Sequence, residues 1–248
     1  MGPPSVYPHQ LCEFPRRPAP IEKDAACAFI VEPRRHGALR LSTRSVRQTL
    51  GPATRIFVFH GCNPEDAEYA REQLRGLDPI TYVPLKVGNL DAYEYSVLLA
   101  CPEFYYFFGA TYALCFQSDA LLLPFSPFKL TDFYGYDWVG APWAWAYGRK
   151  GNGGVSLRNV PRMRQILYEH PYPNHIRPNE DLYISQLPDV SVAPPDLMRQ
   201  FSVESLYFSS PFALHAPWKH LRTQQLRQLA QYAPCFRELL LHNGRELP

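Results

Sequence analysis

Two short apolar runs constrain the fold of this chain more than any other feature. They are AACAFIV at 25–31 and RIFVFHG at 55–61. Continuous runs of this length are typical of strands buried on both faces, as in a parallel sheet covered by helices. The segment between them, 39–51, carries leucine and valine at helical spacing and closes on a glycine. It therefore predicts a helix that connects two neighbouring strands.

The same alternation continues along the chain. Asn63 and Pro64 begin a helix over 63–77, because asparagine caps helices and proline suits the first helical position. The other elements that the pattern predicts are a strand at 81–85, a helix over 91–108 broken near Pro102, a strand at 112–117, helices over 159–170 and 179–187, and a surface helix from 221 that Pro234 ends, followed by a frayed end at 239–248.

These elements predict an α/β fold with a mostly parallel central sheet flanked by helices and with long Pro/Gly-rich loops. Proline supports a mixed fold, because 26 prolines in 248 residues would break the long helices of a bundle or coiled coil. We expect one domain over 23–248 and an irregular N-terminal arm over 1–22.

Charge and cysteine spacing exclude several classes. The chain has 25 Lys and Arg against 23 Asp and Glu, a net charge of +2, whereas proteins held on nucleic acid usually show a clear basic excess. None of the six cysteines forms a CxxC pair, so no zinc site is predicted. No apolar run resembles a secretory signal or reaches the length of a membrane span. We therefore expect a cytoplasmic protein with reduced thiols and no nucleic-acid partner.

Four polar features could carry chemistry, and each has a structural alternative. Asp119 follows a buried strand, where sheet edges bind ligands, but a turn-forming aspartate would look the same. The segment GNGG at 151–154 suits a loop that contacts a ligand closely, or a tight hairpin turn. Glu180 and Asp181 could supply a general base or be ordinary helix-start acids. His215 could bind a metal or be structural.

The order of these features is more specific than any one of them. The relevant stretches are FIVEPRRHGAL, IFVFHG, FQSDALLL, YDWVGAPW, GNGGVSLRN, NEDLYIS, FSVES and LHAPW, within about 25–218. Together they resemble GT-A glycosyltransferases. The resemblance is closer to a poorly characterised family within that superfamily, known from large DNA viruses, bacteria and fungi. It implies a single GT-A-like domain.

The resemblance also implies a divalent cation, Mn²⁺ or Mg²⁺. The GT-A metal motif, Asp-x-Asp, is placed on Asp119 with Leu121 at its second acidic position, and the late histidine ligand is His215. A leucine there leaves the cation less negative charge. If no metal binds, Arg34, Lys150 or Arg158 could contact the diphosphate instead.

Further roles follow from the resemblance alone. In inverting members the aspartate of the Glu-Asp pair is the base, which here is Asp181, with Glu180 the less favoured candidate. The donor-binding positions that it implies are Glu32, Arg34, His60, Gln117, Ser118, Asp119, Gly151, Asn152, Gly153 and Gly154. The acceptor-binding positions are Trp143, Trp145, Glu204 and Trp218.

We therefore expect a glycosyltransferase that moves a hexosyl or pentosyl group from a nucleotide-diphosphate sugar to a glycan or other hydroxyl acceptor, with inversion. Two alternatives stay open. One is an inactive GT-A-like domain that binds glycan or a protein partner, which the leucine in the metal motif favours. The other is a nucleotidyltransferase, which would need two clustered carboxylates for two metal ions.

Overall fold

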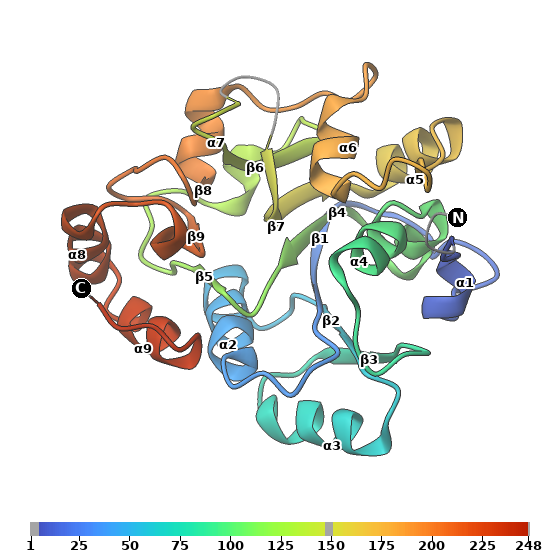
Figure 1. Cartoon of the computed structure of the whole chain (residues 1–248), viewed down its shortest axis with the longest axis horizontal. Coiled ribbons are helices and arrows are strands. Elements are labelled where there is room, and N and C mark those ends of the chain that lie inside the picture. The colour runs from blue at the N-terminus through green and yellow to red at the C-terminus, as the bar shows by residue number, and fades with distance from the viewer. Residues whose placement is uncertain (1–4, 147–150, 248) are drawn as a thin grey trace.

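A six-stranded sheet forms the centre of the molecule (Figure 1). The computed structural model describes residues 5–146 and 151–247. The strand order is β3-β2-β1-β4-β7-β6. The strands are β1 (Glu22–Val31), β2 (Ile56–His60), β3 (Ile80–Pro84), β4 (Ala110–Phe116), β6 (Trp138–Pro142) and β7 (Gly151–Asn159). The first four pair in parallel, and only β7 runs antiparallel to its neighbours. The predicted mostly parallel α/β sheet is confirmed.

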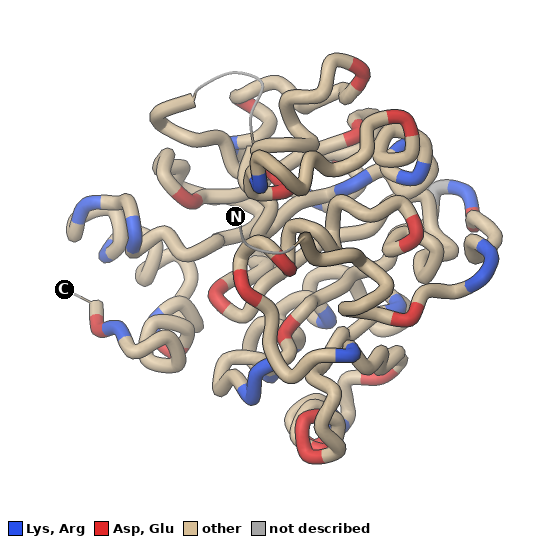
Figure 2. Tube along the Cα trace, turned by 45° about the vertical axis from the view of Figure 1, so that its right-hand side comes forward, with Lys and Arg blue, Asp and Glu red and all other residues tan. Residues whose placement is uncertain are grey.

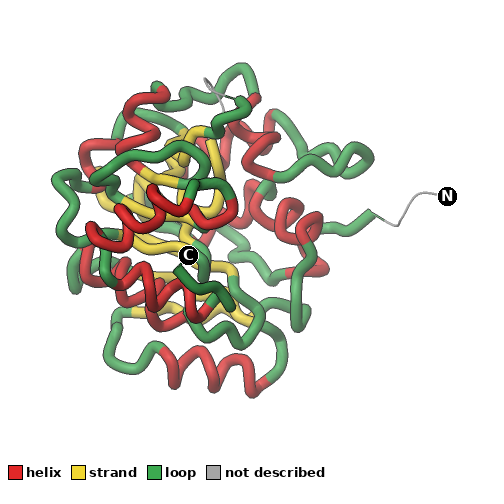
Figure 3. The backbone as a smooth tube through the Cα atoms, turned by 60° about the vertical axis from the view of Figure 1, so that its left-hand side comes forward, coloured by secondary structure: helices red, strands yellow, loops and turns green. Residues whose placement is uncertain are grey.

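Helices cover both faces of this sheet, as Figure 3 shows. The helices are α1 (Pro8–Leu11), α2 (Leu39–Leu50), α3 (Pro64–Gln73), α4 (Ala92–Leu99), α5 (Val160–Glu169), α6 (Glu180–Gln186), α7 (Pro195–Phe201), α8 (Thr223–Tyr232) and α9 (Cys235–His242), with 3-10 turns η1 (Pro102–Phe107), η2 (Leu130–Phe133) and η3 (Pro217–Lys219). In β1, Phe29 packs with α4, η1 and α5, whereas Ile30 packs with α2, α3 and α7. The strand is buried on both faces, which is why its sequence is continuously apolar.

A second, smaller sheet has the order β5-β9-β8, formed by β5 (Ala120–Leu122), β9 (Ala213–His215) and β8 (Ser202–Val203). Only residues 117–119 separate β4 of the large sheet from β5 of the small one. Because Ala120 pairs with His215 across β5 and β9, Asp119 and His215 are brought together although they are far apart in sequence. The link between the two sheets is therefore a defined place for polar chemistry.

Most of the predicted elements are confirmed, including the helix at 39–51, the break near Pro102 and the caps of the helices that start after Asn63 and Asn159. One prediction was wrong in the middle of the chain. The segment GNGG at 151–154 is neither a loop nor a hairpin turn but the first part of the nine-residue strand β7 (Gly151–Asn159). Glycine is unfavourable in strands in general, so the sequence pattern concealed a strand whose glycines serve close packing.

The predicted frayed end was also wrong. Residues 235–242 form α9, and Leu239 and Leu240 are buried. They belong to a third apolar cluster, which joins α8 and α9 to Leu121 of β5 and Leu214 of β9. Figure 1 shows α8 and α9 beside the small sheet. The C-terminal helices therefore support the strands that carry Asp119 and His215 to their places.

Other global features agree with the composition. Figure 2 shows basic and acidic residues spread over the fold, in keeping with the small net charge of +2. No helix in the described ranges 5–146 and 151–247 is both long enough and apolar enough to span a bilayer. Within the first 22 residues, α1 packs on α4, and the backbone of Cys12 forms an isolated antiparallel β-bridge with that of Leu85. The division into an arm and a domain stays a prediction.

The buried end of the chain gives a first testable prediction. Leu239→Ala removes a fully buried side chain, at 0% exposure, so it should lower the free energy of unfolding by about 2 to 5 kcal/mol. Leu241→Ala, two residues on and 67% exposed, is the matched control and should change it by less than about 0.5 kcal/mol. Urea unfolding measures both. Equal losses from the two variants would show that α9 does not pack as described.

Candidate functional site

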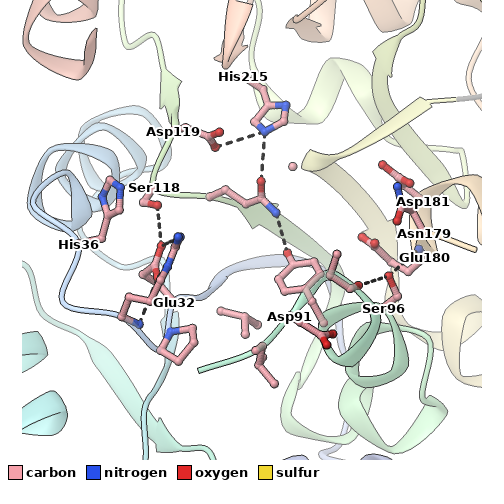
Figure 4. Close-up of a pocket in the computed structure, with 18 of the residues that line it drawn as sticks. Glu32, His36, Asp91, Ser96, Ser118, Asp119, Asn179, Glu180, Asp181 and His215 are labelled. Atoms are coloured by element: carbon pink, nitrogen blue, oxygen red, sulfur yellow. Dashed lines mark hydrogen bonds and ion pairs between the residues drawn. The ribbon is translucent and has the colours of Figure 1, made fainter. Parts of the chain in front are cut away.

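A pocket of ≈ 570 Å³ lies at the carboxyl ends of the parallel strands β1 and β4. This is the edge at which open α/β sheets bind ligands. Figure 4 shows the polar side chains that line it. They come from the end of β1, the start of α4, the link between β4 and β5, strand β7, the start of α6 and β9. The volume is within the range of pockets for small molecules and cofactors.

Asp119 and His215 meet at one wall of this pocket. Asp119 Oδ1 lies 3.3 Å from His215 Nε2, and Asp119 Oδ2 accepts a hydrogen bond from Lys219 Nζ at 3.1 Å. Burial raises the pKa of Asp119, but His215 and Lys219 lower it more, so it stays well below its ordinary value. Burial lowers the pKa of His215, whereas Asp119 and Glu204 raise it to about 10. Asp119 is therefore a carboxylate held among cations.

The position beside Asp119 in the pocket is occupied by Gln117, not Leu121. Leu121 is fully buried, pairs with Leu214 and belongs to the C-terminal apolar cluster. Gln117, two residues before Asp119, lines the pocket and places its Oε1 3.1 Å from His215 Nε2. Leu121, at the second position of the predicted Asp-x-Asp motif, therefore points into the core and not into the pocket.

Asp119, His215 and Gln117 bring three possible metal donors together, but the raised pKa of His215 means that its ring must lose a proton before it can bind a cation. Within the described part of the chain, no group of three or more His, Cys, Asp and Glu side chains is arranged to hold a metal. The amide oxygen of Gln117 supplies a third donor beside Asp119 and His215. Asp119 Oδ1 is buried, and among the described residues its one close polar neighbour is the ion-paired His215 Nε2. The two oxygen donors are of the kind that Mn²⁺ and Mg²⁺ prefer, with one carboxylate instead of two.

Glu180 and Asp181 line the same pocket at the start of α6. Asp181 Oδ2 accepts the Gly153 N–H at 3.0 Å, and its Oδ1 accepts the Leu182 N–H at 2.7 Å. Burial raises the pKa of Asp181, although these two N–H groups oppose the shift. Burial and Asp181 raise the pKa of Glu180 to about 7, against the effect of Arg158. Two neighbouring carboxylates therefore line one largely buried wall of the pocket.

The glycines of β7 allow this convergence by being small. A Cβ on Gly153 would lie 2.5 Å from Glu180 Oε1, and one on Gly154 would lie 2.2 Å from His215 Nε2. Neither has the positive φ that glycine alone tolerates well. What the strand needs is close approach of its backbone to side chains on both sides.

The opposite end of the pocket is formed by the segment after β1. Glu32 is buried, and Arg34 donates to both of its carboxylate oxygens, at 2.8 and 2.9 Å. Ser118 Oγ donates to Glu32 Oε2 at 2.6 Å. His36 and Asn243 complete this end. In Figure 4 Glu32 and His36 lie on one side of the view, Asn179, Glu180 and Asp181 on the other, with Asp119 and His215 between them.

Several predicted residues lie elsewhere. His60, Trp143, Trp145, Glu204 and Trp218 are not among the residues that line this pocket. His60 is buried beside the Gly61 carbonyl, and Glu204 lies behind the wall, 3.0 Å from Asn152 Nδ2 and 3.2 Å from His215 Nδ1.

The tryptophans occupy two surroundings. Trp143 is buried and stacks on the exposed Trp145 at 4.9 Å, and Trp218 stacks on Phe236 at 6.2 Å. Gly151 lies in β7 but outside the lining. Of the suggested cationic substitutes, Arg158 is buried beneath Glu180, and Lys150 lies outside the described residues.

Sequence reasoning missed part of the lining. The missed residues are Val31, Pro33, His36, Asn89, Leu90, Asp91, Ala92, Tyr95, Ser96, Asn179, Lys219 and Asn243. Asp91 had a usable signal, because Asp91 and Glu94 form a capping box at the start of α4, and that start follows β3 at the ligand-binding edge of the sheet. No sequence signal pointed to Asn243, because its position depends on the packing of α9.

Comparisons with solved structures give the fold. The galactosyltransferase LgtC, in complex with donor and acceptor sugar analogues, superposes with a TM-score of 0.56 at 13% identity, over 89% of this chain and 96% of that chain. The glycosyltransferase GlyE of Streptococcus pneumoniae TIGR4 gives 0.54 at 12% identity, over 90% of this chain and 66% of that chain. At these identities the likeness shows a GT-A glycosyltransferase fold and nothing finer.

A third structure and two sequence comparisons complete the picture. The mannosyltransferase PcManGT of Pyrobaculum calidifontis, in complex with GDP-Man and Mn²⁺, gives a TM-score of 0.51 at 12% identity, over 94% of this chain and 66% of that chain. A family model described as a protein of unknown function, DUF5672, matches residues 80–215. The comparison with curated proteins gave no sequence match.

The tight packing around β7 gives a second prediction. Gly154→Ala places a methyl group inside the His215 ring, whose three nearest atoms would lie within 2.2 to 2.6 Å. It should lower the free energy of unfolding by about 1 to 3 kcal/mol. Gly88→Ala meets only the end of the Asn63 side chain at 3.3 Å and should cost clearly less. Urea unfolding compares them, and equal midpoints would contradict the close approach of β7 to His215.

Proposed function

Because the chain belongs to the DUF5672 family and folds as GT-A glycosyltransferases do, we propose that it transfers a sugar from a nucleotide-diphosphate donor to a hydroxyl acceptor, with inversion. One observation carries the proposal. The Asp119–His215 pair and the Glu180–Asp181 pair line one pocket at the sheet edge, so a group that can balance a diphosphate and a group that can take a proton face the same space.

The pocket suggests how the donor lies. Two hydrogen bonds to Glu32 fix the orientation of the planar Arg34 guanidinium. A plane of this kind suits stacking with a nucleobase. His36 and Asn243 border this end and would contact the nucleoside. The sugar would then lie over Gly154 and Asn152, towards α6.

The diphosphate falls between these ends in the proposal. Lys219 lies beside Asp119 at this wall and can contact phosphate oxygens as a point charge. A divalent cation held by Asp119, Gln117 and His215 would offset the negative charge of the leaving diphosphate. The neighbour that contains GDP-Man and Mn²⁺ supports a nucleotide sugar and a cation as the ligands to test first.

Asp181 is the proposed base. As the acceptor oxygen forms its bond to the anomeric carbon, its O–H bond breaks and the proton passes to the Asp181 carboxylate. The anomeric carbon–oxygen bond to the diphosphate breaks at the same time, and the electron pair leaves with the diphosphate. Attack opposite the leaving group inverts the anomeric centre. The Gly153 and Leu182 N–H groups fix the carboxylate, so no covalent nucleophile is required.

The finer sequence-based predictions stay predictions. They include acceptor contacts by Trp143, Trp145, Glu204 and Trp218, the hexosyl or pentosyl class of donor, and the placement within a family of large DNA viruses, bacteria and fungi. The cytoplasmic location and the lack of a nucleic-acid partner also stay predictions. The nucleotidyltransferase alternative loses support, because the pocket neighbour of Asp119 is the amide of Gln117 and not a second carboxylate.

A panel of nucleotide sugars tests the proposal. UDP-glucose, UDP-galactose, UDP-N-acetylglucosamine and GDP-mannose would each be incubated with the protein, with a set of sugar acceptors, in Mn²⁺ or in excess chelator. At least one donor should release its nucleoside diphosphate, and its binding should raise the melting temperature, because it binds only the folded state. Thermal stabilisation without turnover would favour the inactive-domain alternative. A flat response to the whole panel would contradict the proposed function.

The assignment of the base gives a fourth prediction. Asp181→Asn keeps the size of the side chain and one of its two oxygen acceptors but cannot take the proton, so the turnover rate should fall at least about 100-fold. Binding of the nucleoside diphosphate, measured by calorimetry, should stay within about threefold, because Asp181 lies at the far end of the pocket from Arg34. Turnover that is unchanged in this variant would rule out Asp181 as the base.

A further inference from the structure

Arg158 is a fully buried cation beneath the proposed active site. It lies in β7 with 0% exposure. Its guanidinium is packed over the ring of Trp138 at 4.5 Å and near that of Phe29 at 5.7 Å. A charge so far from water is very costly unless it is paired and hydrogen-bonded. The side chains that partner Arg158 must therefore stay in place.

The hydrogen bonds of Arg158 account for each nitrogen of the guanidinium. Nη1 donates to Tyr105 Oη and Nε donates to Ser156 Oγ, each at 3.0 Å. Nη2 donates to Glu180 Oε1 at 3.2 Å and to the Gly153 carbonyl at 3.5 Å. Among the described residues, Glu180 is the one carboxylate within ion-pair distance of Arg158. The buried cation thus has a single counter-ion.

The two partners of Nη2 are also the two neighbours of Asp181. Glu180 precedes Asp181 in the chain, and Gly153 donates its N–H to Asp181 Oδ2. One guanidinium nitrogen therefore contacts the side chain of Glu180, the residue before Asp181, and the carbonyl of Gly153, the residue whose N–H binds the Asp181 carboxylate. The absence of a side chain on Gly153 allows this contact, because a Cβ there would lie 3.0 Å from the Asp181 Cβ and still closer to Glu180.

We propose that Arg158 is a positioning residue that fixes the Asp181 carboxylate through Gly153 and Glu180, and that Glu180 is the counter-ion of Arg158 and not the base. The proposal rests on the proposed function for the meaning of Asp181. Burial and Asp181 raise the pKa of Glu180, but its protonation during turnover would leave the buried Arg158 without its counter-ion. Asp181 is 9% exposed and lines the pocket, so an acceptor hydroxyl can reach it.

Hydrogen exchange tests the positioning without any substrate. In Arg158→Met, the amide of Gly153 should lose protection at least about tenfold, because Asp181 is no longer held against it. Arg164→Met is the matched control. Arg164 is half-buried, donates to the carbonyls of Tyr105 and Phe108 and lies over Tyr106, so its loss should leave the Gly153 amide unchanged. Equal protection of Gly153 in the two variants would overturn the proposal.

A double substitution distinguishes the positioning of Asp181 by Arg158 from the contribution of the Arg158–Glu180 pair to stability. Arg158→Met alone leaves Glu180 buried and unpaired, so the melting temperature should fall by about 10 °C. Arg158→Met with Glu180→Met removes both charges, and replacing a buried ion pair by apolar side chains is often neutral. The double variant should therefore recover the melting temperature but not the protection of the Gly153 amide. Recovery of both would show that the pair serves stability alone. If Arg158→Met fails to fold, the double variant still gives this answer.

Kinetics with a donor that the panel identifies tests the role of Glu180. Glu180→Gln keeps an oxygen for Arg158, so kcat should stay within about tenfold of the unsubstituted protein, whereas Asp181→Asn loses at least about 100-fold. The double methionine variant should lower kcat with KM for the donor nearly unchanged. If Glu180→Gln falls as far as Asp181→Asn, Glu180 is the base and the proposal fails. A panel without turnover contradicts the proposed function, while hydrogen exchange still decides whether Arg158 positions Asp181.

Discussion

The close approach of the β7 backbone to side chains on both of its sides is the constraint on which the site depends. Gly153 contacts the Glu180–Asp181 pair, and Gly154 contacts the ring of His215. Successive residues of a strand face opposite ways, so two adjacent glycines let one strand touch two groups of polar residues. The side chains that the proposed reaction uses at the diphosphate and at the acceptor thereby both border this strand and the same pocket.

Strand β7 can approach these side chains closely because its other contacts fix its position in the sheet. It pairs with β4 on one side and with β6 on the other, both antiparallel. Arg158, near its end, is buried among aromatic rings and hydrogen-bonds back to the Gly153 carbonyl. The small sheet brings His215 to the other side through its pairing with Ala120. The geometry of the site is therefore set mainly by backbone pairing, with few flexible side chains involved.

The sequence was most informative where local pattern and tertiary structure agree. Apolar runs buried on both faces predicted β1 and β2, and caps such as Asn63 and Asn159 predicted where helices begin. It failed for β7, because glycine is rare in strands and the reason for it here lies in residues such as Glu180 and His215, far away in sequence. It failed for α9 because the leucines that the helix buries face strands from another part of the chain.

For the site, sequence reasoning found the residues that stand at strand ends and helix starts, such as Asp119 and Asp181. It placed the second position of the metal motif on Leu121, since spacing alone does not say which way a short strand turns its side chains. Lys219 and Asn243 were missed for a related reason. Both come from the C-terminal part of the chain, whose return to the pocket is a matter of packing.

The return of the C-terminal helices to the pocket has a consequence for folding during translation. The pocket is lined by residues from Val31 to Asn243, so segments that are synthesised far apart in time contribute to it. During translation, the six strands of the large sheet leave the ribosome well before α9 does. A nascent chain can therefore build its sheet early, but its pocket lacks the Asn243 end until α9 has also left the ribosome.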